Sequence, residues 1–187
     1  MPRDRDAVRR RLQEAAIAMF DTDGYGATTA AGIAMRAGVT ERTFFRHFPD
    51  KREVLFGGEA ALSSILMDQI HAAPPTLAPW PVLFQALEKA VPFLSQNRLH
   101  SRIRRRVIAD NPPLQERELA KTMVLTTSLA NALQERGSPE GAALLAASLA
   151  MAVLARAFAK WLDAEVGELS DHLHRAFREA HALIAPT

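Results

Sequence analysis

The sequence predicts an all-α protein with two parts, a small N-terminal domain of three helices and a larger C-terminal helical domain. Apolar residues recur at helical spacing along most of the chain, and we identify no strand. Threonine, glycine and proline also stand where short helices would begin and end between residues 28 and 51. We therefore expect about nine helices, and we place the domains at residues 1–52 and 53–187.

The first predicted helix covers Arg5 to Thr22, with an apolar stripe from Val8 to Phe20. Two short helices joined by a tight turn follow it. Thr29 can cap the first of them, because its hydroxyl can accept a hydrogen bond from an N–H that has no partner at a helix start. Gly38 ends that helix, since glycine tolerates the left-handed conformation. Thr40 can cap the next helix in the same way as Thr29.

The second short helix has an apolar and a polar face. Phe44 and Phe48 lie four residues apart and can pack on the first helix, which gives the layout of a helix-turn-helix. In that motif the second helix enters the major groove of DNA. Arg42 and Arg46 lie away from the phenylalanines, and an arginine can form two parallel hydrogen bonds with a guanine edge. The residues predicted to contact DNA, at bases or backbone, are Thr28, Thr29, Thr40, Arg42, Thr43, Phe45, Arg46, His47 and Lys51.

This segment resembles the DNA-binding domain of the TetR/AcrR family of bacterial repressors. The matching residues are Ala15 to Phe20, Gly24, Tyr25, Thr28, Thr29, Ile33, Ala34, Ala37 to Thr40, Thr43, His47, Phe48 and Lys51. The family usually has Gly in place of Arg42 and Tyr in place of Phe45. The resemblance implies a DNA-reading domain attached to a domain that binds a small molecule and forms a dimer.

Six further helices are predicted. A helix from Asp50 to about His71 is expected to link the two parts, and Pro92 is expected to kink or break the fifth helix. Ser138 is expected to cap the eighth helix, with Pro139 at its first position. The fifth to ninth helices are predicted at about 80–96, 98–109, 112–136, 139–165 and 169–184.

The sixth helix is rich in arginine, with Arg98, Arg102, Arg104, Arg105 and Arg106. Three interpretations stay open. The arginines can pair with nearby acids such as Glu116 and Glu118, contact the DNA-binding module or the DNA backbone, or capture an anionic group of a ligand. The stretch Thr40 to Lys51, the basic helix and the stretch Ile108 to Arg117 together resemble the branch of the family that includes mycofactocin-system regulators. That resemblance implies an acyl-coenzyme A effector.

The family resemblance also implies a hollow core in the C-terminal domain. Met and aromatic side chains suit an adaptable apolar cavity, although the same apolar stripes suit a filled core equally. The residues predicted to line the pocket are Phe84, Leu87, Val91, Leu94, Ile103, Val107, Met123, Leu154, Phe158 and Trp161.

The last two helices are assigned to a dimer interface, as a four-helix bundle across a two-fold axis. The Ala-rich eighth helix permits close approach of a partner, and the ninth carries one apolar stripe. The residues predicted at the interface are Leu149, Val153, Leu169, Leu173, Phe177, Ala180 and Ile184.

Composition excludes several classes of protein. The chain has no cysteine, which rules out disulfides and thiolate metal sites and suits a reducing cytoplasm. Its N-terminus is charged, so we expect no signal peptide. The apolar stretch Ala142 to Ala155 is too short for a membrane span, and we expect no membrane partner. Residues 1–52 carry ten Lys/Arg and seven Asp/Glu, an excess that fits attraction to phosphate.

Candidate metal and catalytic sites are weak. His172, His174 and His181 invite a metal site, but no acid or third ligand completes a set, so we expect surface histidines. No catalytic or phosphate-binding motif appears, and we expect neither an enzyme nor a cofactor.

These observations lead to one functional prediction with one alternative. The chain is expected to be a cytoplasmic, homodimeric repressor that binds a near-palindromic operator. A small apolar effector, such as an acyl-coenzyme A or a fatty acid, is expected to release it from DNA. The alternative is a constitutive, sequence-specific DNA-binding protein with a filled core and no effector.

Overall fold

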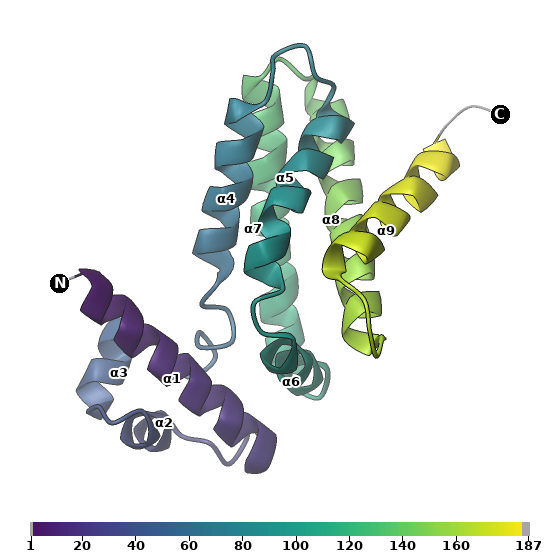
Figure 1. Cartoon of the computed structure of the whole chain (residues 1–187). Coiled ribbons are helices and arrows are strands. Elements are labelled where there is room, and N and C mark those ends of the chain that lie inside the picture. Colours follow the sequence, from purple (N-terminus) through teal and green to yellow (C-terminus); the bar gives the residue numbers. More distant parts are fainter. Residues whose placement is uncertain (1, 185–187) are drawn as a thin grey trace. The chain divides into compact units, whose positions relative to one another are not determined.

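Figure 1 shows the computed structural model of the protein, which describes residues 2–184 and the side-chain burial of residues 5–183. Helices make up its regular structure, and no strand occurs among the described residues, which confirms the predicted all-α class. The helices are α1 (Pro2–Thr22), α2 (Ala30–Arg36), α3 (Glu41–His47), α4 (Glu59–Ala72), α5 (Pro79–Leu94), α6 (Arg98–Ala109), α7 (Pro112–Glu135), α8 (Glu140–Asp163) and α9 (Leu169–Ile184).

The chain divides into two compact units that do not follow the linear boundary expected between residues 52 and 53. The first unit combines Met1–Glu59 with Leu99–Glu118. The second unit combines Ala60–Arg98 with Leu119–Thr187. The first unit therefore contains most of α6 and the first turns of α7, in addition to the three N-terminal helices.

One apolar core holds the first unit together. Full burial of a single large apolar side chain contributes about 1.5–3 kcal/mol, so a core shared by several segments ties them firmly to one another. Two segments outside residues 1–52 contribute to it, which explains why they belong to this unit. The buried residues include Leu12, Ala16 and Phe20 of α1, Ile33 of α2 and Phe44 of α3. They also include Phe48, Val54, Leu55 and Phe56 between α3 and α4, Ile103, Val107 and Ile108 of α6, and Leu114 of α7.

The second unit is a bundle in which α4, α5, α7 and α8 run alongside one another, with α9 against α8 (Figure 1). Its core draws on every one of these helices. On α8, the small residues Ala143, Ala147 and Ala150 have no exposed surface, and they let the neighbouring helices approach closely.

Helix α8 is the one described helix that is long and apolar enough to cross a membrane by length and composition. It is longer than the apolar stretch expected from the sequence. The core helix of a soluble protein passes the same test, and the buried alanines place one face of α8 in the core of the second unit.

The helix predicted from Asp50 begins at Glu59 instead. Asp50 does act as a cap, because its carboxylate accepts hydrogen bonds from the N–H groups of Arg52 (2.7 Å) and Glu53 (3.1 Å). Tight turns follow, closed by bonds such as Leu55 N–H to the Arg52 carbonyl at 3.0 Å. The glycine pair at 57–58 disfavours a helix here, since glycine loses the most backbone freedom on folding. The bonds of Asp50 therefore close a turn, and the helix expected from this residue does not begin until Glu59.

The start of α8 and the effect of Pro92 also differ from the predictions. Ser138 does not cap α8, because its N–H bonds to the Leu133 carbonyl (3.1 Å) and completes the end of α7. Pro139 is the N-cap residue, with no side-chain cap. Pro92 does not break α5, which continues to Leu94, so the proline removes one hydrogen bond in the last turn.

Candidate DNA-binding site

Each helix of the predicted motif begins at a threonine, as expected. The Thr29 hydroxyl accepts a hydrogen bond from the Gly32 N–H at 3.0 Å, at the start of α2. The Thr40 hydroxyl accepts one from the Thr43 N–H at 3.2 Å, at the start of α3. Both bonds satisfy donors that a helix start would otherwise leave unpaired.

The turn between α2 and α3 depends on Gly38, whose φ of +69° lies in the left-handed region. This conformation brings the Val39 N–H within 3.0 Å of the Ala34 carbonyl and closes the end of α2. No neighbouring atom fills the space beside Gly38, so backbone conformation rather than crowding explains the glycine.

The two helices are locked by aromatic packing. Phe44 and Phe48 are fully buried, with ring centroids 5.8 Å apart, and Ile33 of α2 has no exposed surface. These contacts confirm the apolar face predicted from the spacing. They leave the opposite face of α3 open to solvent.

That open face carries most of the predicted DNA-contacting residues. Arg42, Phe45 and Arg46 are exposed, with half of the Phe45 surface accessible. Thr29 and Thr40 are also exposed, at the starts of α2 and α3, and Thr43 is half-buried on α3. Within the described chain, neither the Arg42 nor the Arg46 guanidinium has a hydrogen-bond or ion-pair partner.

Three other predicted contacts, Thr28, His47 and Lys51, are instead buried or bonded within the protein. The Thr28 side chain is 1% exposed and donates to the Gly24 carbonyl at 2.8 Å, so it holds the loop before α2. His47 is also buried, and its Nε2 has no partner among the described residues. Neither side chain lies on the open face, because both are buried.

The Lys51 ammonium sits in a cage of backbone carbonyls. It donates to the Tyr25 carbonyl at 2.7 Å and the Thr28 carbonyl at 2.8 Å, and it lies 4.3 Å from the centre of the Tyr25 ring. Burial lowers the pKa of Lys51 from its ordinary value. The cage ties the turn after α3 to the loop before α2.

Arg9 of α1 is a positioning residue that the sequence did not reveal. It donates to the His47 carbonyl (3.0 Å), at the end of α3, and to the Gly57 carbonyl (3.3 Å). Its guanidinium also lies 4.3 Å from the centre of the Phe48 ring. A Cβ at Gly57 would come within 2.5 Å of the Gln13 amide, so the absence of a side chain at Gly57 lets α1 lie close to this turn. In the sequence, Arg9 is only an arginine beside an apolar stripe, and that pattern does not show which groups it bonds to.

A family comparison agrees with this geometry. Residues 12–56 match the family model for bacterial regulatory proteins of the tetR family. The match begins in α1, contains α2 and α3, and ends in the turns before α4. Residues 12–56 therefore resemble a tetR-family N-terminal domain. No curated protein sequence matches the chain at a significant level.

Solved structures of tetR-family proteins share the fold over nearly the whole chain. The Thermus thermophilus repressor FadR in complex with lauroyl-CoA is 20% identical, with 96% of each chain covered and a TM-score of 0.60. SmeT, the repressor of the Stenotrophomonas maltophilia efflux pump SmeDEF, is 21% identical in its triclosan complex, with 95% of this chain and 91% of SmeT covered and a TM-score of 0.67. A putative regulator from Syntrophomonas wolfei is 16% identical, with 98% and 96% covered and a TM-score of 0.70.

Two arginines of α6 bond to residues 12–56 within the first unit. Arg104 donates to the Leu55 carbonyl at 2.7 Å and pairs with Glu118 at 2.9 Å. Arg106 pairs with Asp21 at the end of α1. These contacts support two of the three interpretations of the basic helix, pairing with acids and contact with the DNA-binding module.

The predicted pocket residues do not all come together. Ile103 and Val107 are buried in the core of the first unit, in one cluster with residues of α1, α2 and α3. Met123 is 70% exposed on α7, so it lines no cavity within the described chain. Seven residues do gather in the second unit, in two adjoining clusters: Phe84, Leu87, Val91, Leu94, Leu154, Phe158 and Trp161.

A different pocket, of about 580 Å³, opens in the first unit. It lies where the end of α1 and the following loop meet the end of α6, and Val107 is its one residue from the predicted effector pocket. Its lining is Phe20, Asp21, Gly24, Tyr25, Gly26, Arg106, Val107, Asp110 and Asn111.

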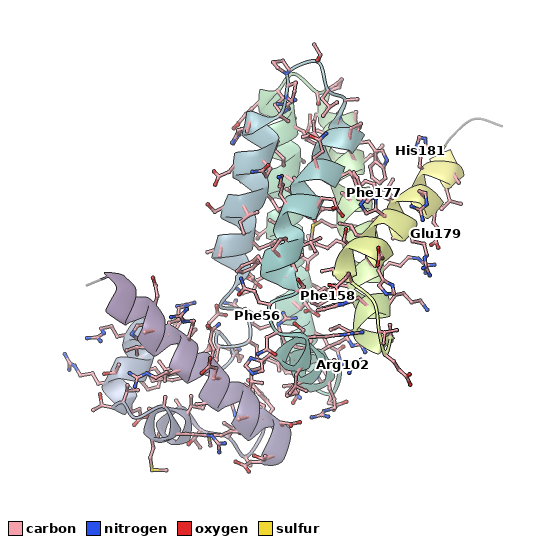
Figure 2. The ribbon with its side chains drawn as sticks, in the orientation of Figure 1. Phe56, Arg102, Phe158, Phe177, Glu179 and His181 are labelled. Carbon is pink, nitrogen blue, oxygen red and sulfur yellow. The ribbon has the colours of Figure 1, made fainter. Side chains whose placement is uncertain are left out.

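The apolar stripe predicted for the dimer interface is instead buried inside the second unit. Phe177 of α9 packs against Trp80 and Phe84 of α5, with ring centroids 4.3 and 4.5 Å apart, and it points away from the side of α9 that carries Glu179 (Figure 2). The stripe faces inwards because α9 covers α5 and α8 of its own chain. Buried with it are Val153, Leu169, Leu173 and Ala180, whereas Leu149 is half-buried and the side chain of Ile184 lies outside the described residues.

The three C-terminal histidines do not converge. His174 lies 3.3 Å from a Glu88 carboxylate oxygen, while His181 is exposed near the end of α9 (Figure 2). The described residues contain no group of three or more side chains able to hold a metal ion.

Proposed function

We propose that this protein is a transcription repressor that binds a near-palindromic operator as a homodimer and leaves DNA when a small, largely apolar effector binds. The open face of α3 carries the proposal. Arg42 and Arg46 can bond to guanine edges or phosphates, and Phe45 between them can contact a thymine methyl group. The caps, the Gly38 turn and the buried phenylalanines hold this face rigid.

Selection of bound duplexes from a random pool tests the DNA-binding part of the proposal. Two copies of α3 related by a two-fold axis should enrich a near-palindrome, with half-site centres about one or more helical turns apart. Enrichment of no sequence would contradict specific reading. Enrichment of a single unpaired half-site would contradict the dimer.

The dimer is proposed to use the outer faces of α8 and α9, not the buried stripe. Leu145, Ser148 and Ala152 are exposed at helical spacing on α8, and Leu145 is 74% exposed. Leu183 of α9 is 85% exposed. An apolar helix face with small residues suits close packing against a second copy.

The effector is proposed to bind among the apolar residues of the second unit. Phe158 and Trp161 of α8 have ring centroids 5.4 Å apart, and Val91 and Leu94 of α5 pack against Trp161. FadR with lauroyl-CoA and SmeT with triclosan are fold relatives whose ligands carry an apolar part, an acyl chain in one and aromatic rings in the other. On this basis we propose an acyl-coenzyme A, a fatty acid or another small apolar molecule.

A route for coupling is proposed through α6. The chain passes from the second unit to the first at the start of this helix. Beyond that point Arg104 holds the Leu55 carbonyl, and Arg117 of α7 pairs with Glu53, which is 16% exposed. A ligand that displaced α6 would therefore pull on the turns that follow α3. By linkage, the factor by which ligand weakens DNA binding equals the factor by which DNA weakens ligand binding.

One observation favours the alternative, a constitutive DNA-binding protein with a filled core. Leu87, Leu154 and Trp161 are each at most 7% exposed and pack against other side chains. Titration of acyl-coenzyme A, fatty acids and a broad metabolite library against the operator complex separates the two functions. Release by at least one ligand supports the repressor with an effector, and release by none supports the alternative.

A further inference from the structure

The end of the recognition helix α3 lies against α1. Arg9 of α1 donates to the His47 carbonyl at 3.0 Å, and α1 begins beside α3 (Figure 1). Arg5 lies four residues before Arg9, so the two arginines share one face of α1. The Arg5 side chain therefore lies one helical turn before Arg9 on the same face of α1.

The environment of His47 shows that guanidinium groups gather at this place. The pKa of His47 is lowered first by burial and then by the charges of Arg46, Arg5 and Arg9. No carboxylate contributes to that shift. The end of α3 is thus surrounded by positive charge from two helices.

The three arginines differ in what they bond to. Arg9 is occupied by two backbone carbonyls and the Phe48 ring. Arg5 and Arg46 are exposed, and neither has a hydrogen-bond or ion-pair partner within the described chain. By contrast, Arg104, Arg106 and Arg117 in the same unit all pair with carboxylates.

We propose that Arg5 binds a backbone phosphate of the operator, next to the phosphate or base reached by Arg46, so that α1 takes part in DNA binding together with α2 and α3. This inference rests on the proposed function, since DNA is the anionic partner. Guanidinium groups form strong hydrogen bonds with phosphates, and these contacts do not depend on the base sequence. Arg5 and Arg46 place two guanidinium groups, unpaired within the described chain, at the end of the recognition helix, where they can make such contacts. Arg5 would strengthen binding to every sequence without changing which base is preferred.

The test compares Arg5→Gln with Arg10→Gln in the full-length protein. Arg10 is an exposed arginine of the same helix, turned about 140° away from Arg5, so the control has the same loss of charge. Affinity is measured on the selected operator and on an unrelated duplex over a range of salt concentrations. In Arg5→Gln the slope of log K against log salt should become shallower by about 0.9 per protomer on both duplexes, while Arg10→Gln matches the wild type.

Neutral methylphosphonates placed one at a time along the operator locate the contact. One substitution per half-site should weaken the wild type and have no further effect on Arg5→Gln, and Arg5→Lys should restore the sensitivity. The inference is overturned if every methylphosphonate weakens wild type and Arg5→Gln equally, or if the Arg5→Gln salt slope equals that of Arg10→Gln. Thermal melting of each variant shows whether a change in affinity reflects unfolding.

The two proposals fail in different ways. If the wild type prefers no sequence, the proposed repressor function fails, yet the slope on the unrelated duplex still decides the role of Arg5. If the wild type prefers the operator and Arg5→Gln behaves like the control, only the inference about α1 fails.

Discussion

At the scale of single residues, the positively charged side chains near α3 divide into those that hold the fold and those left open. Lys51 and Arg9 bond to backbone carbonyls, whereas Arg42 and Arg46 have no partner within the described residues. Sequence alone put Lys51 among the DNA contacts, since a lysine beside a recognition helix fits phosphate well. Its cage depends on three carbonyls 23 to 26 residues away along the chain, which no local pattern reveals.

Arg42→Ala should relax base preference at one position in each half-site. Loss of a bidentate contact to guanine removes about 1–3 kcal/mol of discrimination there, and other positions should keep their preferences. Binding to every single-base variant of the operator measures this profile, with Arg10→Ala as the control. If the base preferences are unchanged in Arg42→Ala, Arg42 does not contact a base that sets specificity.

Lys51→Met should lower the melting temperature and leave the salt slope of DNA binding unchanged. Removing the ammonium leaves the Tyr25 and Thr28 carbonyls without their donor, which costs about 1–3 kcal/mol. Thermal melting and salt titration provide the two measurements. A shallower slope at an unchanged melting temperature would show instead that Lys51 binds phosphate.

At the scale of helices, proline and glycine residues predicted where some helices begin and end. The sequence pattern did not show which neighbouring helix packs against an apolar stripe. The bounds of α6 and α9 agree with the predictions, because a proline pair ends one segment and a glycine precedes the other. The helix predicted from Asp50 was wrong because the same side-chain bonds that begin a helix also close an isolated turn. The stripe on α9 was correct as a pattern, but its partner is α5 of the same chain.

Leu145→Glu and Phe177→Glu should therefore have different effects. A carboxylate at exposed Leu145 should split the proposed dimer and leave the fold intact, because unpaired charge is unfavourable in an apolar interface. At Phe177 the same charge would be buried against Trp80 and Phe84 and should unfold the second unit. Light scattering and thermal melting distinguish these results. A Leu145→Glu protein that stays dimeric would place the interface elsewhere.

At the scale of the whole molecule, the proposed repressor function needs two states of the protein, one preferred by DNA and the other by the proposed effector. A ligand that binds the released state about a hundredfold better shifts the equilibrium by ~2.7 kcal/mol, enough to empty most operators. The seven apolar residues gathered in the second unit are the proposed place for it. Sequence predicted these seven but also assigned Ile103 and Val107 there, since periodicity does not show which unit a stripe faces.

Phe158→Arg should block release by the effector while preserving operator binding. A charge among Trp161, Val91 and Leu94 would repel an apolar ligand, and Phe158 is half-buried, so the arginine can reach solvent. Phe158→Leu, which keeps the site apolar, should remain releasable. Ligand titration against the operator complex tests both variants, and normal release of Phe158→Arg would move the site away from Phe158.

Binding to an operator with one half-site scrambled tests the central claim most directly. If two copies of α3 read the two halves, the intact operator should bind two protomers, and scrambling one half should weaken binding by at least one hundredfold, since each lost base contact costs about 1–3 kcal/mol. Equal affinity for the intact and scrambled duplexes, or one protomer bound to each, would contradict symmetric reading by a dimer.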